Sequence, residues 1–180
     1  MARPRSFDET QAVRDAVQVF WSNGYPATGV RELCEAMGIQ SGSFYASFGS
    51  KSSLFVRAVG QYVHDLGLPD PSPAAARAYL ERIAAERSPT GCLLAISAAE
   101  RHALEPDGQQ AVVAQVRRLE RWLGACLQNR APVDATRDAR LLATMAWGLQ
   151  VQHRAGVSPT DLRGRVDHLA GLLELPPMPR

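Results

Sequence analysis

The chain has 180 residues, 46% of them hydrophobic, so it can bury a sizeable core without a disulfide or a metal ion to stabilise it. No apolar run reaches the ~20 residues that a membrane-spanning helix needs, and the residues after Met1 form no hydrophobic signal segment, so we expect a soluble, cytoplasmic protein. The net charge of +2 is too small to indicate nucleic-acid binding, so composition alone does not support that function, and only a pattern of residues could.

The first predicted helix covers residues 7–23. Ser6-Phe7-Asp8-Glu9 has the S-x-x-E spacing of a capping box, in which each end satisfies a free backbone N–H of the other. Gly24 can then end the helix in a left-handed conformation. Apolar residues recur between these two ends at helical spacing, at Val13, Ala16, Val17 and Phe20.

Two short helices joined by a tight turn follow the first helix. Thr28 can cap the earlier of the two, which ends at Gly38 and has apolar residues at positions i, i+3, i+4 and i+7. Residues 41–47 can form about two helical turns. Phe44 and Phe48 give that second helix an inner face, while its outer face is small and uncharged.

A longer helix begins at Lys51 and runs towards Leu66, and the proline-rich segment 68–73 ends it. Further helices are expected near residues 73–87, 90–104, 107–129, 135–155 and 159–174. No segment alternates between apolar and polar residues with a period of two. The predicted fold class is therefore all-α.

The short helix over residues 41–47 has the character of a helix that reads the major groove of DNA. A small outer face lets the backbone approach the bases, and serine and glutamine groups both donate and accept hydrogen bonds. Tyr45 and Lys51 can bind phosphates from the edges of the groove. Arg3 and Arg5 form an arm ahead of the first helix that can enter the minor groove. The candidate base-reading residues are Gln40, Ser41, Gly42, Ser43 and Ser47.

Residues 28–55, T-G-V-R-E-L-C-E-A-M-G-I-Q-S-G-S-F-Y-A-S-F-G-S-K-S-S-L-F, resemble the TetR family of bacterial transcriptional regulators. The resemblance extends over roughly residues 7–60. It implies phosphate contacts from Thr28, Tyr45 and Lys51, and base or backbone contacts from Gln40, Ser41, Ser43 and Ser47. Two positions depart from the family pattern: Gln40 adds a polar residue ahead of the serine in the turn, and Ser53 replaces a glutamate that is often found there.

The resemblance implies a helix-turn-helix DNA-binding domain over residues 1–50 and a helical effector-binding and dimerisation domain over residues 51–180. The expected function is repression of transcription, with release from a palindromic double-stranded operator by a small hydrophobic effector. Repression is preferred to activation because excluding polymerase requires only tight binding. The alternatives are an effector-independent DNA-binding protein and an α-helical enzyme, and no di-iron, hydrolase, P-loop or dinucleotide motif supports an enzyme.

Two further sites are expected in the C-terminal region. Bulky apolar residues indicate an effector pocket lined by Tyr62, Ile96, Trp122 and Trp147, although ordinary core packing explains the same residues. The last two helices have apolar area to spare for a second copy of the chain. The predicted homodimer interface consists of Leu141, Met145, Leu149, Leu162, Val166, Leu169 and Leu173.

The spacing of the cysteines and histidines suits neither zinc nor a C-x-x-C pair, so we expect reduced thiols, no metal and no cofactor. Cys92 is the candidate for a sensor thiol, because it is expected at a helix N-terminus, where a thiol pKa falls. A packed structural cysteine is the alternative at that position.

Overall fold

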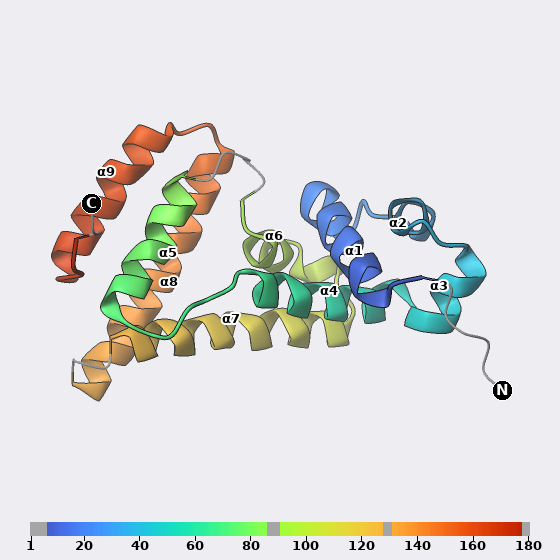
Figure 1. Cartoon of the computed structure of the whole chain (residues 1–180), viewed down its shortest axis with the longest axis horizontal. Helices are drawn as coiled ribbons and strands as arrows, with labels where there is room; N and C mark the ends of the chain where they lie inside the picture. The colour runs from blue at the N-terminus through green and yellow to red at the C-terminus, as the bar shows by residue number, and fades with distance from the viewer. Residues whose placement is uncertain (1–6, 86–90, 128–130, 178–180) are drawn as a thin grey trace. The chain divides into compact units, whose positions relative to one another are not determined.

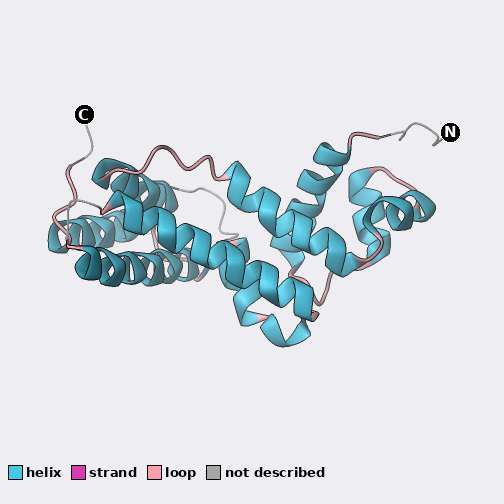
Figure 2. Ribbon diagram, turned by 90° about the horizontal axis from the view of Figure 1, so that it is seen from below, coloured by secondary structure: helices cyan, strands magenta, loops and turns pink. Residues whose placement is uncertain are grey.

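The computed structural model describes residues 7–85, 91–127 and 131–177, and these residues form helices and no strand (Figures 1 and 2). The predicted all-α fold class is confirmed. None of the helices in these three ranges is long and apolar enough to cross a membrane. The elements are α1 (Glu9–Asn23), α2 (Val30–Met37), α3 (Ser41–Phe48), α4 (Lys51–Asp65), α5 (Pro73–Ala85), α6 (Leu93–Ala99), the 3-10 helix η1 (Arg101–Ala103), α7 (Pro106–Cys126), α8 (Pro132–Arg154) and α9 (Pro159–Leu172).

Two predicted helix caps need correction. Asp8 caps α1, because its Oδ1 accepts hydrogen bonds from the backbone N of Thr10 at 2.8 Å and of Gln11 at 3.1 Å. Ser6, the predicted cap, lies outside the described residues. Thr28 does not cap α2: Gly29 holds the N-cap position, and the Thr28 hydroxyl points back into the preceding turn.

The predicted helix over residues 90–104 is too long. The helical segment α6 ends at Ala99, and the short 3-10 helix η1 follows it before α7 begins at Pro106. Proline suits the first position of a helix, because the backbone N–H groups of the first turn have no acceptor within the helix and the missing N–H of proline costs no hydrogen bond. The other helices end within a few residues of the predicted positions.

The chain forms two compact units. Unit 1 contains α1 to α4, α6, η1 and the α7 residues up to 115. Unit 2 contains α5, the α7 residues from 116 onwards, α8 and α9. The division of the chain after residue 50 into a DNA-binding and an effector-binding part concerns function, and it stays a prediction.

Unit 1 is held together by an aromatic cluster from α1, the α1–α2 turn and α4. The ring centre of Phe55 lies 5.2 Å from that of Phe20 and 4.9 Å from that of Tyr25, both in edge-on arrangements. All three side chains are buried. Edge-on pairs stabilise a core beyond the area that they bury, so this cluster fixes how α1 and α4 pack.

Unit 2 is a bundle in which α5 packs against both α8 and α9 (Figure 1). Its core contains Leu80, Leu142, Leu162 and Val166, each of them fully buried. At the edge of this core, Arg77 of α5 forms ion pairs with Glu81 at 3.0 Å and with Asp167 of α9. Burial of these apolar side chains is thus the main contribution to the stability of the bundle, and the ion pairs of Arg77 lie at the edge of its core.

Candidate nucleic-acid interface

The turn between α2 and α3 sets the direction of α3. Gly38 has a left-handed backbone (φ 64°, ψ 31°), which favours glycine. The backbone N of Ile39 donates to the carbonyl of Cys34 at 3.0 Å, and that of Gly38 donates to the carbonyl of Glu35 at 3.2 Å. These bonds satisfy the last carbonyls of α2 and allow α3 to begin three residues later.

One face of α3 anchors it and the other lies at the surface. Phe44 and Phe48 are 0% and 5% exposed, whereas Tyr45 is 55% exposed. An added Cβ at Gly42 would meet no atom within 4 Å, so the space above this glycine is open. Ser41, Gly42 and Ala46 are exposed, and Ser43 and Ser47 are half-buried. Apart from Tyr45, the side chains on the outer face are therefore small, and none of them is charged, as a helix that approaches a base pair closely requires.

A groove of about 660 Å³ separates α2 from α3. Two charged residues of its lining, Arg31 and Glu35, form an ion pair at 2.9 Å on the exposed side of α2. Exposed pairs of this kind contribute little to stability, so both side chains can rearrange at low cost. The lining residues are Val30, Arg31, Cys34, Glu35, Gly38, Ile39, Gln40, Ser41 and Tyr45.

Thr28 is placed differently from the position that the family resemblance implies. It is only 1% exposed, and its hydroxyl donates to the carbonyl of Gly24 at 2.6 Å. Because the Thr28 hydroxyl donates this intramolecular hydrogen bond, it does not point towards a phosphate in this arrangement. Its role is to close the α1–α2 turn.

Lys51, the first residue of α4, braces the same turn. Its Nζ donates to the carbonyls of Tyr25 and Thr28, both at 3.0 Å, and lies 4.1 Å from the centre of the Tyr25 ring. An ammonium group has three N–H donors, and these two hydrogen bonds use two of them. Lys51 thus links the start of α4 to the turn that precedes α2.

Two acidic residues that the sequence pattern did not single out also contact this turn. Glu100 Oε2 accepts a hydrogen bond from the backbone N of Tyr25 at 2.9 Å, and a Glu105 carboxylate oxygen accepts one from the Tyr25 hydroxyl. They lie 75 and 80 residues away from Tyr25 along the chain. No motif could have pointed to them, because only the packing of α6, η1 and α7 brings them there.

The predicted effector residues are divided between the two units. Tyr62 and Ile96 belong to unit 1, whereas Trp122 and Trp147 belong to unit 2. Tyr62 is buried and stacks edge-on with Trp21 of α1, with ring centres 5.3 Å apart. Trp122 stacks edge-on with Tyr79 of α5 at 5.8 Å. A single pocket lined by all four residues stays a prediction.

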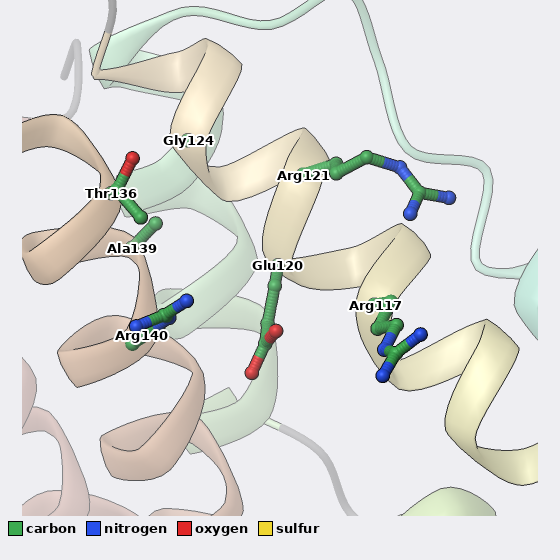
Figure 3. A pocket seen from close by; sticks show the side chains of 7 residues that line it. All are labelled: Arg117, Glu120, Arg121, Gly124, Thr136, Ala139 and Arg140. Atoms are coloured by element: carbon green, nitrogen blue, oxygen red, sulfur yellow. The ribbon is translucent and has the colours of Figure 1, made fainter. Parts of the chain in front are cut away.

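Unit 2 contains a groove of about 560 Å³ that the sequence pattern did not predict. Figure 3 shows charged side chains leaving α7 and α8 around it. The groove is open and largely charged, so it differs from the apolar pocket that the sequence predicts. Its lining residues are Arg117, Glu120, Arg121, Gly124, Thr136, Ala139 and Arg140.

Most of the predicted dimer residues are already buried within their own chain. Leu141 and Met145 of α8 are 46% and 38% exposed and remain available to a second copy. The other five belong to the core of unit 2 and have no surface to offer, which corrects their assignment as interface residues. They are Leu149, Leu162, Val166, Leu169 and Leu173.

The structure makes Cys92 a packed residue. It is 3% exposed and precedes α6 rather than lying within it. Cys34 and Cys126 are buried as well, and burial raises the pKa of both thiols. No three His, Cys, Asp or Glu side chains of the described ranges gather in a cluster that could hold a metal ion. Arg3 and Arg5 lie outside these ranges.

Comparison with known proteins places the helix-turn-helix segment in one family. The family model described as "Bacterial regulatory proteins, tetR family" matches residues 13–58. The HTH-type transcriptional repressor BdcR of Escherichia coli K12 is 28% identical over 176 residues, which cover 89% of this chain and 86% of BdcR. The repressor ComR of the same organism is 38% identical over 61 residues, 34% of this chain and 29% of ComR.

Solved structures agree over nearly the whole chain. A cysteine mutant of the TetR family transcriptional regulator CifR, complexed with a 26-base-pair double-strand operator DNA, matches with a TM-score of 0.76 and 28% identity over 98% of this chain and 100% of CifR. The reduced form of Escherichia coli NemR has a TM-score of 0.78 and 20% identity over 91% of this chain and 96% of NemR, a likeness of fold. Residues 13–58 thus carry the helix-turn-helix segment of the TetR family of bacterial regulatory proteins, and the chain is similar over most of its length to regulators of that family.

Proposed function

We propose that the protein is a sequence-specific transcriptional repressor that binds double-stranded operator DNA in the cytoplasm through α3. The observation that carries this proposal is the exposed, small and uncharged outer face of α3 beside the groove that separates it from α2. The complex of CifR with operator DNA supports it, because CifR matches 98% of this chain at 28% identity.

In this proposal α3 lies in the major groove. Ser41 and Gly42 at its start allow a close approach to the base edges, and Ser43 lies one position further along. Tyr45, with more than half of its side chain exposed, can direct its hydroxyl at a phosphate. Lys51 adds one cationic donor at the start of α4.

A second copy of the chain would complete the repressor. Leu141 and Met145 lie four residues apart on α8, so they share one exposed face. Leu172 at the end of α9 is 68% exposed and adds apolar surface. Two-fold pairing through these helices places two α3 helices on one operator, and such an operator is then palindromic.

We further propose a small, mainly hydrophobic effector that binds in unit 2. Two buried polar atoms of α8, Trp147 Nε1 and Gln150 Oε1, have no hydrogen-bond partner in the described part of the chain. They lie three residues apart, hence on one side of the helix. An unpaired buried donor or acceptor costs roughly 1–3 kcal/mol, which a ligand with an acceptor and a donor would offset.

A gel-shift assay on the protein's own promoter tests the proposal. We expect the protein to retard this duplex but not a scrambled one, and a member of a panel of hydrophobic compounds to reverse the shift. Deleting the gene should raise transcription of its own or a neighbouring unit. A fall in these transcripts would indicate an activator, and a shift that no compound reverses would favour an effector-independent regulator.

A further inference from the structure

The α1–α2 turn is held by residues that lie outside the helix-turn-helix segment. Glu100, between α6 and η1, accepts a hydrogen bond from the backbone N of Tyr25 at 2.9 Å. Glu105, directly before α7, accepts one from the Tyr25 hydroxyl. Both ends of one residue, its amide and its phenol, are thus bound by carboxylates. Hydrogen bonds to an ionised acceptor are about twice as strong as neutral ones, so these two hold the turn firmly.

The other contacts of Tyr25 connect it to the proposed DNA-binding residues. Its carbonyl accepts from Lys51 Nζ at 3.0 Å, and its ring lies under the same ammonium group at 4.1 Å. Burial, followed by the Glu105 carboxylate, raises the pKa of the Tyr25 hydroxyl well above its ordinary value. The phenol therefore stays a neutral donor throughout the physiological range of pH.

A separate contact joins the start of α7 to the start of α4. The Ser52 hydroxyl donates to Asp107 Oδ1 at 2.5 Å, and Ser52 directly follows Lys51. The segment from Glu100 to Asp107 therefore contacts the helix-turn-helix at Tyr25 and at the first turn of α4. Tyr25 lies before α2, and the first turn of α4 follows α3, so these contacts lie on either side of the α2–α3 pair.

We propose that Glu100 and Glu105 are positioning residues for operator binding. They touch no DNA in this assignment. By fixing Tyr25 they fix the turn that precedes α2 and the carbonyls that orient Lys51, and so they keep α3 and Lys51 in one arrangement. The proposal rests on the proposed function, since it assigns these carboxylates a part in reading the operator.

The test compares operator binding by Tyr25→Phe and by the wild type. This substitution removes the hydroxyl that Glu105 binds and keeps the ring that packs against Phe20 and Phe55. We expect operator affinity to fall at least about fivefold, the lower end of usual coupling effects, with a smaller fall on a scrambled duplex, where only the orientation of Lys51 matters. Tyr79→Phe is the matched control, because it removes a hydroxyl from a buried tyrosine of unit 2 and should leave operator affinity unchanged.

A double-mutant cycle separates positioning from general stabilisation. Glu105→Ala should weaken operator binding, and combining it with Tyr25→Phe should add little, because both remove one bond. Glu105→Gln, which keeps an acceptor oxygen, should restore most of the affinity. Hydrogen exchange at the Tyr25 amide should speed up in Glu100→Ala.

All affinities are measured well below each variant's melting temperature, where the protein is folded. Equal operator affinities of folded Tyr25→Phe and wild type would overturn the assignment, even if the melting temperature fell. Failure of the wild type itself to bind its promoter duplex would overturn the proposed function, and the positioning role with it. The two failures are distinguished by the wild-type lane of the same experiment.

Discussion

The carboxylate of Glu100 occupies the space that a side chain on Gly24 would need. A Cβ added to Gly24 would lie 2.8 Å from Oε2 of Glu100 and still nearer to Oε1. Glu100 could move away only by giving up its hydrogen bond from the backbone N of Tyr25. The backbone of Gly24 (φ 79°, ψ 168°) is, in addition, in a region that only glycine adopts readily.

Gly24→Ala should therefore lower the free energy of unfolding by roughly 2–4 kcal/mol, from backbone strain together with the broken hydrogen bond. Gly38→Ala is the control for a glycine with a positive φ, because Gly38 (φ 64°, ψ 31°) is left-handed and an added Cβ there would meet no atom within 4 Å. Strain alone should cost this control roughly 1–2 kcal/mol. Urea denaturation measures both, and equal decreases would show that the Glu100 hydrogen bond contributes nothing.

Lys51→Ala should weaken binding to operator and scrambled duplexes alike. If the third ammonium donor binds a phosphate, the slope of log K against log salt should fall in magnitude by about 0.9 for each phosphate that is no longer neutralised. Titrations at several salt concentrations measure this slope. Arg163→Ala removes a cation from the exposed side of α9 and should leave both affinity and slope unchanged. An unchanged slope for Lys51→Ala would exclude a phosphate contact, and the function of Lys51 would then be limited to its hydrogen bonds to the carbonyls of Tyr25 and Thr28.

Ser43→Ala should lose roughly 1–3 kcal/mol of binding free energy on the operator and little on scrambled DNA. The structure argues against a capping role, since α3 has Gln40 at its N-cap and no side-chain capping bond. Ser50 is the matched control: its hydroxyl oxygen caps α4 by accepting from Ser53 N at 3.0 Å. Ser50→Ala should lower the melting temperature instead of specificity. A uniform loss of affinity for Ser43→Ala would reassign it to positioning.

Leu141→Asp combined with Met145→Asp should give a folded monomer, because these exposed side chains are the apolar part of the proposed interface on α8. Light scattering measures the mass, and circular dichroism checks that the helices persist. Leu169→Ala is the contrasting variant: Leu169 is 3% exposed, so it should lose roughly 2–5 kcal/mol of stability through a core cavity. A double variant that remains a dimer would exclude this face of α8.

The Ser52–Asp107 hydrogen bond should stabilise the protein in a pH-dependent way. The Ser52 hydroxyl, together with the N–H of Gly108, holds the pKa of the Asp107 carboxyl below its ordinary value of 3.8. A carboxyl with a lowered pKa in the folded state stabilises the protein above its unfolded pKa, and this contribution is lost as the pH falls through the folded pKa.

The stability difference between wild type and Ser52→Ala should therefore be largest near neutral pH and shrink from about pH 6 to about pH 3. Urea denaturation at both pH values measures the difference. Ser53→Ala removes a hydroxyl from the next residue, which binds Ser50 and no carboxylate, so its effect should not depend on pH. A constant difference for Ser52→Ala would mean that Asp107 titrates alike in the folded and unfolded chains.

The amino-acid sequence by itself determined the local features of this protein. Helical spacing of apolar residues predicted the helices, because amphipathic periodicity is a property of neighbouring residues. Gly38 marked the end of α2, and Phe44 and Phe48 marked the inner face of α3, for the same local reason. The family resemblance rested on residues 28–55, which include α2 and α3 and lie within the range that the family model matches.

Only the tertiary structure decided which side chains are free to act. Leu169 and Leu141 both lie on apolar helix faces, and packing buries the first while leaving the second at the surface. Thr28 and Lys51 match the family pattern, yet folding directs both to the α1–α2 turn. Glu105 reaches Tyr25 across 80 residues of chain, and no local pattern encodes such a contact, because it depends on how whole helices pack.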